Sequence, residues 1–125
     1  MNWAAIGAVL MALAVAMGAF GAHGLRSRLD AYSMSVYEKA VFYHFIHALG
    51  ILLVALLART SAITVQGQTR VGWLLLAGIV IFSGTLYALA ITGARILGAI
   101  TPIGGLAFIA GWLLLAYEVA RVQRS

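Results

Sequence analysis

Three histidines and a tyrosine are the side chains of this sequence best suited to chemistry. Tyr43, His44 and His47 lie within one apolar run, and His23 follows an earlier one. Tyr43 and His47 are four residues apart and therefore share one face of a helix. A neutral imidazole can bind zinc, copper or haem iron, and it titrates near neutral pH. Because ionisable residues inside apolar helices often mark proton, ion or ligand paths, the group is a candidate site.

A packing role is the alternative for the same histidines. Each imidazole can hydrogen-bond across helices to a backbone carbonyl or to the hydroxyls of Ser83, Thr85 and Tyr87 in the third apolar run. The apolar runs carry no carboxylate at depth and no known metal-ligand spacing. We therefore predict neither a metal site nor a cofactor, and packing is favoured over ligand or proton binding.

No catalytic residue is predicted. Ser83 lies in the string Phe82-Ser-Gly-Thr-Leu, which lacks the G-x-S-x-G elbow of a serine nucleophile. The chain has no cysteine, which excludes disulfides, thiolate metal sites and thiol nucleophiles. Gly104-Gly105 lacks the following lysine and hydroxyl residue of a phosphate-binding loop.

The composition places these residues in a membrane protein. Hydrophobic residues make up 64% of the 125 residues and charged residues 9%, and the mean hydropathy is +1.05. A soluble domain has about 25% charged residues, so the bilayer must be the solvent of this chain. The net charge of +5 is spread over the ends of the apolar runs, which indicates positioning at the membrane interface and no nucleic-acid partner.

Four apolar runs predict an all-α fold, an integral membrane bundle of four transmembrane helices in one domain covering residues 1–125. The helices are expected at about 3–22, 36–58, 71–93 and 102–120, each long enough to cross a bilayer core. A cleaved signal peptide is the alternative for the first run. That alternative is disfavoured because only Met1 and Asn2 precede it, where a signal would carry basic residues.

Short polar signals predict where two of these helices begin. Ser35-x-x-Glu38 has the spacing of a capping box and predicts the start of the second helix. Thr101 followed by Pro102 predicts the N-cap and first residue of the fourth helix.

Polar residues outside the four runs are expected to be solvated. Residues 60–69 are expected to connect the second and third helices outside the membrane. Residues 26–32 form either a short interfacial helix or a loop, and both stay open. Glu118 and Arg121, three residues apart near the end of the fourth helix, are expected to form a solvated pair.

An even number of spans places both termini on one side of the membrane. Trp3 and Trp73 are then expected at one interface. Basic side chains number four on each side, with Arg59, Arg70, Arg121 and Arg124 facing the side of the termini and Arg26, Arg28, Lys39 and Arg95 the other. The free amino terminus breaks this tie, and we predict that both termini are cytoplasmic.

Four strings of the sequence occur together in a known family. They are GAFGAHGL at 18–25, YHFIHALGIL at 43–52, FSGTLYAL at 82–89 and TPIGGLAFIAGW at 101–112. On these strings the chain resembles the YgdD-like family of small bacterial inner-membrane proteins, a domain of unknown function with animal relatives. The resemblance implies a four-span helical protein of the bacterial inner (cytoplasmic) membrane, and it implies no reaction.

The resemblance also marks characteristic positions, which are His23, Tyr43, His47, Ser83, Gly84, Tyr87, Thr101, Pro102, Gly104, Gly105 and Trp112. The family often has glutamine in place of His44, which leaves His23 and His47 as the better candidate pair. From the residues themselves, three glycines at three-residue spacing predict a surface of close helix approach, and these are Gly18, Gly21 and Gly24.

The function expected from the sequence is that of a non-enzymatic membrane module. It would bind a lipid, a quinone-like or other small apolar molecule, or a membrane-protein partner, in a polar pocket. The pocket residues would be His23, Tyr43, His47, Ser83 and Tyr87, with His44 as a further candidate. A proton-coupled small transporter or channel is one alternative, and an intramembrane metal or haem protein is another. An oligomer is compatible with the sequence.

Overall fold

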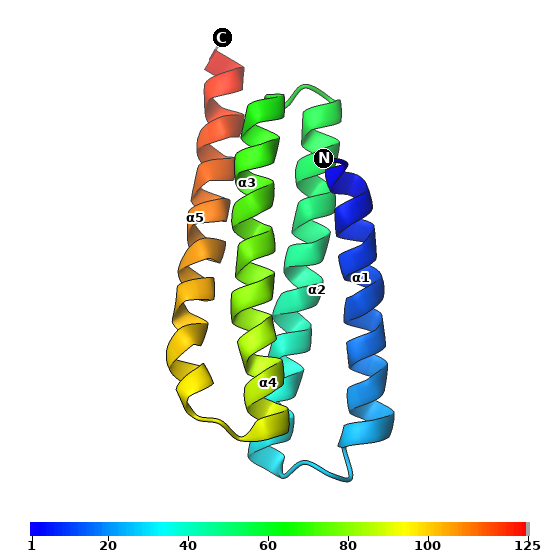
Figure 1. The fold of residues 1–125 in the computed structure, drawn as a ribbon. Helices are drawn as coiled ribbons and strands as arrows, with labels where there is room; N and C mark the ends of the chain where they lie inside the picture. The colour runs from blue at the N-terminus through cyan, green and yellow to red at the C-terminus, as the bar shows by residue number, and fades with distance from the viewer. Residues whose placement is uncertain (125) are drawn as a thin grey trace.

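The structure describes residues 1–124, apart from the Arg124 side chain. The chain forms four long helical segments, here called rods, which run alternately up and down (Figure 1). In this computed structural model, α1 (Trp3–Phe20) continues into a π-helical turn, η1 (Gly21–Leu25), and α2 (Ala31–Arg59) is the second rod. The third rod joins α3 (Val65–Gly78), a second π-helical turn η2 (Ile79–Ser83) and α4 (Gly84–Thr92); the fourth is α5 (Ile96–Arg124). Both termini lie at the same end of the bundle (Figure 1).

The second and third rods form the centre of the bundle. α1 packs on α2, and α5 packs on α3, η2 and α4, so that α1 and α5 lie at opposite edges (Figure 1). Four fully buried aliphatic side chains pack at the core between the central rods, namely Ile51, Val54, Val71 and Leu75.

A tryptophan pair holds the first turn of α1 against α3. Trp3 is buried, and its ring meets that of Trp73 edge-on with 5.5 Å between centroids. Gly72 makes room for this contact, because a Cβ there would lie 2.7 Å from the Trp3 ring. The two tryptophans therefore lie at the same end of the bundle, as the sequence predicted.

The lengths and surfaces of the rods fit a bilayer. The four candidate spans have 23, 29, 28 and 28 residues with mean hydropathies between 1.9 and 2.3. At about 1.5 Å per residue they are at least ~35 Å long, which exceeds a hydrocarbon core of about 30 Å. Large apolar side chains such as Leu13, Leu53 and Leu113 are exposed on the outside. The predicted fold class, an all-α bundle of four membrane helices, is confirmed.

The second helix begins earlier than residue 36, and its predicted cap is wrong. The helix starts at Ala31, and the N-cap is Asp30, whose carboxylate accepts a 2.7 Å hydrogen bond from the Ser33 amide. The Ser35 hydroxyl instead donates to the Tyr32 carbonyl. Asp30 caps the helix in place of Ser35 because Asp30 has an extended backbone and directly precedes the run of helix-forming residues. Residues 26–30 form a turn and not an interfacial helix.

Acid should loosen this first turn of α2. The hydrogen bonds from Ser33, chiefly from its backbone amide, lower the pKa of Asp30 below its ordinary value of 3.8. A carboxyl group whose pKa is lower in the folded state stabilises that state above its unfolded pKa, and the stabilisation is lost as the pH falls through the folded pKa. We expect the Ser33 amide to lose hydrogen-exchange protection below pH 3.8, and Asp30→Asn to abolish this pH dependence. Identical profiles for the two chains would contradict the assignment.

The third and fourth helices are also longer than expected. α3 begins at Val65, capped by Thr64, whose hydroxyl accepts a 2.9 Å hydrogen bond from the Gly67 amide. The expectation that residues 60–69 form a connector is wrong, because only residues 60–64 link the two helices. The physical reason is that the helix continues past the hydrocarbon core, where polar residues remain solvated.

Thr101 is not an N-cap, and Pro102 is not the first residue of its helix. α5 begins at Ile96 and contains Pro102 in its second turn. The Thr101 hydroxyl donates to the Leu97 carbonyl at 3.0 Å and lies 2.6 Å from the Thr85 hydroxyl of α4. Pro102 therefore lies inside the helix, where its missing N–H leaves the Gly98 carbonyl without its usual helical donor.

Glu118 is buried, contrary to the predicted solvated pair. Its side chain has 0% exposure, and Oε2 accepts a 2.9 Å hydrogen bond from Arg121 Nε. Oε1 lies 3.8 Å from an Arg70 guanidinium nitrogen and accepts no hydrogen bond within residues 1–124. Gly67 brings α3 against this carboxylate, since a Cβ there would lie 2.6 Å from Oε2.

Candidate functional site

Both ring nitrogens of His47 are engaged. Its Nδ1 lies 2.8 Å from the Tyr43 carbonyl, and its Nε2 accepts a 3.0 Å hydrogen bond from the Trp112 indole of α5. A carbonyl only accepts and an indole N–H only donates, so the imidazole is neutral with its proton on Nδ1. The Phe108 ring stacks on it with 3.5 Å between centroids. His47 therefore joins α2 to α5.

His44 has one partner and one free nitrogen. Its Nδ1 lies 2.9 Å from the Tyr87 hydroxyl of α4. Its Nε2 is buried and has no hydrogen-bond partner in the described part of the chain. The Tyr87 ring lies 5.2 Å from that of Tyr37, whose hydroxyl donates to the Met17 carbonyl of α1. These aromatic groups link α1, α2 and α4.

Ser83 is a helix-joining hydroxyl. Its side chain is fully buried and donates a 2.8 Å hydrogen bond to the Ala40 carbonyl of α2. The arrangement is the expected one for a serine between membrane helices, where a hydroxyl needs an acceptor inside the bundle.

The predicted pocket residues have different partners in the structure. The Tyr43 ring stacks parallel to His47 and lies 4.5 Å from Phe82, whereas His44 pairs with Tyr87 and Ser83 bonds to Ala40. His23 is exposed on the outer face of η1, whereas Gly21 and Leu25 of the same turn are buried. Four cavities in residues 1–124 are lined by none of the other five candidates, which are Tyr43, His44, His47, Ser83 and Tyr87.

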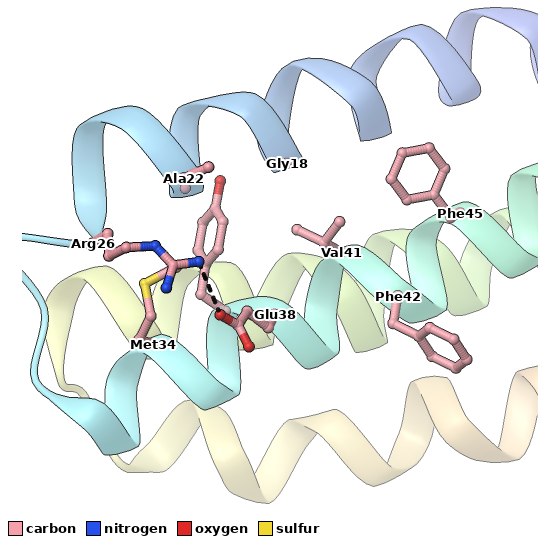
Figure 2. A pocket seen from close by; sticks show the side chains of 10 residues that line it. Gly18, Ala22, Arg26, Met34, Glu38, Val41, Phe42 and Phe45 are labelled. Carbon is pink, nitrogen blue, oxygen red and sulfur yellow. Dashed lines mark ion pairs between the residues drawn. The ribbon is translucent and has the colours of Figure 1, made fainter.

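A groove between α1 and α2 is the best candidate binding site (Figure 2). Its cavity has a volume of about 280 Å³. Figure 2 shows Arg26 and Glu38 side by side at one end, with Gly18 and Phe45 farther along. The lining residues come from one face of each helix, and they are Gly18, Gly21, Ala22, Arg26, Met34, Tyr37, Glu38, Val41, Phe42 and Phe45.

The charged end of the groove is a loose ion pair. An Arg26 guanidinium nitrogen lies 3.8 Å from Glu38 Oε1, and the two side chains are 67% and 58% exposed. The distance exceeds that of a charge-assisted hydrogen bond, about 2.7–2.9 Å. Both groups can therefore accept a polar partner without losing a strong bond to each other.

The glycines of α1 shape the groove and the helix contact beside it. At Gly21 a Cβ would collide with the Tyr37 ring, so the missing side chain allows close helix approach. At Gly18 a Cβ would lie 3.6 Å from Val41 and 3.9 Å from Phe45, which are ordinary contacts. The groove is thus open above Gly18.

Comparison with known proteins assigns the family. A family model described as "Protein of unknown function (DUF423)" matches residues 17–105. The chain belongs to the DUF423 family. A relative from Staphylococcus haemolyticus, "UPF0382 membrane protein SH2409", is 54% identical over 110 residues, 88% of each chain. "UPF0382 membrane protein YwdK" of Bacillus subtilis is 48% identical over 116 residues, covering 93% of this chain and 94% of the relative. No solved structure gives a significant match.

The DUF423 assignment makes this chain a membrane protein of a family whose function is not known. The sequence of this DUF423 chain pointed to three histidines, of which His44 and His47 are buried and His23 is exposed, and it did not point to the groove. The sequence signal for the groove was weak. It consists of Glu38, Val41, Phe42 and Phe45, which have the spacing of one helix face. That spacing becomes a groove only when α1 lies beside it.

Proposed function

We propose that this chain is a YgdD-like, non-enzymatic membrane module that binds a small ligand with an apolar chain in the groove between α1 and α2. The observation that carries the proposal is the groove itself, which is apolar along Val41 and Phe45 and charged at Arg26 and Glu38. Ligand sites in proteins are concave and mostly apolar, with a few polar groups that fix orientation.

In this proposal the buried polar side chains support the site and do not contact the ligand. His47, Ser83 and Tyr87 each hydrogen-bond to a neighbouring helix or turn. Such bonds fix how the helices sit against each other in lipid. Their role is to hold α2 in place so that its outer face can pair with α1.

The proposed location is the bacterial inner (cytoplasmic) membrane, with both termini in the cytoplasm. The named relatives are bacterial membrane proteins, which supports the location. Both termini lie at the same end of the bundle (Figure 1), and the orientation proposed for that end is the one predicted from the sequence.

Filling the groove tests the proposal. Leucine at Gly18 should occupy the space beside Val41 and Phe45 without moving the backbone, because a Cβ is tolerated there. We expect Gly18→Leu to raise the Kd for a bound lipid-sized molecule by about tenfold, equivalent to about 1.4 kcal/mol of binding free energy, and so to lower the fraction of protein that co-purifies with it. Native mass spectrometry of protein extracted in mild detergent measures this fraction.

The matched control is Gly84→Leu. Gly84 is exposed, and a Cβ there would have no atom within 4 Å, so the added leucine lies outside the groove. The control should retain the ligand of the parent chain. Equal ligand occupancy in the parent chain, Gly18→Leu and Gly84→Leu would refute binding in this groove.

A further inference from the structure

We infer, on the basis of the proposed function, that the groove selects a phospholipid whose zwitterionic headgroup carries a primary amine. Arg26 would bind the lipid phosphate, and Glu38 would bind the ammonium group. The upper part of one acyl chain would lie along Gly18, Val41 and Phe45.

The two opposite charges at the mouth of the groove favour a zwitterionic headgroup. Arg26 and Glu38 present opposite charges 3.8 Å apart, and both are more than half exposed. An anionic headgroup would satisfy Arg26 but place like charge against Glu38. A zwitterionic headgroup supplies a partner to each and replaces one long ion pair with two charge-assisted hydrogen-bonded contacts.

The Glu38 carboxylate favours a headgroup with a primary amine. An ionised Glu38 only accepts hydrogen bonds. A primary ammonium group has N–H donors for it, whereas the trimethylammonium group of a choline lipid has none. Hydrogen bonds to charged groups are the stronger ones, so the primary amine is preferred.

The depth of the groove matches that of a lipid molecule. α2 has 29 residues, about 43 Å of helix, and so extends beyond a hydrocarbon core of about 30 Å. Glu38 lies about 10 Å along the axis from Ala31, near headgroup level, and Phe45 lies about 10 Å deeper. Arg26 directly follows the first span. The charged end of the groove is thus at the interface and its apolar end reaches the acyl chains.

A second groove offers a contrast. Its cavity, of about 480 Å³, lies against Gly50 and Trp112, and its lining contains no charged side chain. It therefore has no means to distinguish one headgroup from another.

Competition among headgroups tests the inference. The purified full chain is equilibrated with equimolar phosphatidylethanolamine, its N-methylated derivatives, phosphatidylcholine and phosphatidylglycerol, all with the same acyl chains. Native mass spectrometry then measures which lipid is retained. We expect roughly tenfold preference for the primary amine over choline, the size of a hydrogen bond to a charged group. Binding should fall stepwise as methyl groups replace N–H donors.

Variants assign the selection to the two charges. Glu38→Ala, which removes the acceptor together with the charge, should lower the preference for the primary amine over choline to about one, and Arg26→Gln should weaken retention of all the lipids. Lys39→Gln is the matched control, because Lys39 is exposed next to Glu38 but does not line the groove. It should keep the parent preference.

The outcomes separate the inference from the proposed function. Equal retention of all headgroups that Gly18→Leu abolishes would overturn the headgroup selection and leave the groove as a lipid site. Preference for phosphatidylglycerol would overturn it as well. Retention that Gly18→Leu does not reduce would overturn the proposed function itself.

Discussion

Replacing Gly104 by alanine is expected to destabilise the bundle by about 3 kcal/mol, near the upper end of overpacking effects. A Cβ at Gly104 would collide with the backbone nitrogen of Phe82 and lie 2.8 Å from its Cα. The obstacle is backbone, so no change of rotamer relieves it. α5 must move away from η2, and packing is lost along that interface.

The neighbouring glycine provides the control. A Cβ at Gly105 would lie 3.8 Å from the Phe82 ring, an ordinary contact, so Gly105→Ala should leave stability within about 0.5 kcal/mol of the parent chain. Unfolding with sodium dodecyl sulfate in mixed micelles, followed by tryptophan fluorescence, measures both. Equal stabilities for Gly104→Ala and Gly105→Ala would contradict the packing described here.

Removal of the Arg121 guanidinium is expected to cost about 3 kcal/mol, because it leaves a buried carboxylate without its hydrogen-bond donor. Glu118 has 0% exposure, and Arg121 Nε lies 2.9 Å from it. In Arg121→Gln the nearest remaining ion-pair partner is Arg70 at 3.8 Å. A single distant cation offsets little of the cost of desolvating the carboxylate.

Arg70→Gln is the matched control. Arg70 is 62% exposed and more distant, so its removal should cost about 0.5 kcal/mol, as is usual for exposed pairs. Replacing Glu118 and Arg121 together by leucine should recover part of the loss, because no charge then remains buried between them. The same unfolding titration compares the chains. Equal losses for Arg121→Gln and Arg70→Gln would count against the buried pair.

The sequence predicted the four helices because a bilayer demands about 20 consecutive apolar residues per span. Its predicted helix starts failed at Ser35 and Thr101, since several capping signals compete within a few residues. The choice of Asp30 over Ser35 depends on backbone conformation, which no spacing rule contains. Helices also continue past the hydrocarbon core at little cost, so hydropathy marks the core and not the helix end.

The candidate site was predictable only in part. His44 and His47 stand out because titratable residues are rare in apolar runs, but their partners Tyr87 and Trp112 follow from the packing of rods distant in sequence. The burial of Glu118 depends likewise on how closely α3 packs against α5. The groove forms between two helices, so the sequence of α1 or of α2 alone does not predict it.

The π-helical turn η2 (Ile79–Ser83) sets the angular position of the side chains in the second half of the third rod. A π-helical turn closes over one residue more than an α-helical turn. If residues 79–83 formed a regular α-helix instead, every later side chain would be rotated by about 100° around the helix axis. Thr85 would then turn away from Thr101, and Tyr87 from His44. The wide turn therefore allows α4 to face its partners on α5 and α2.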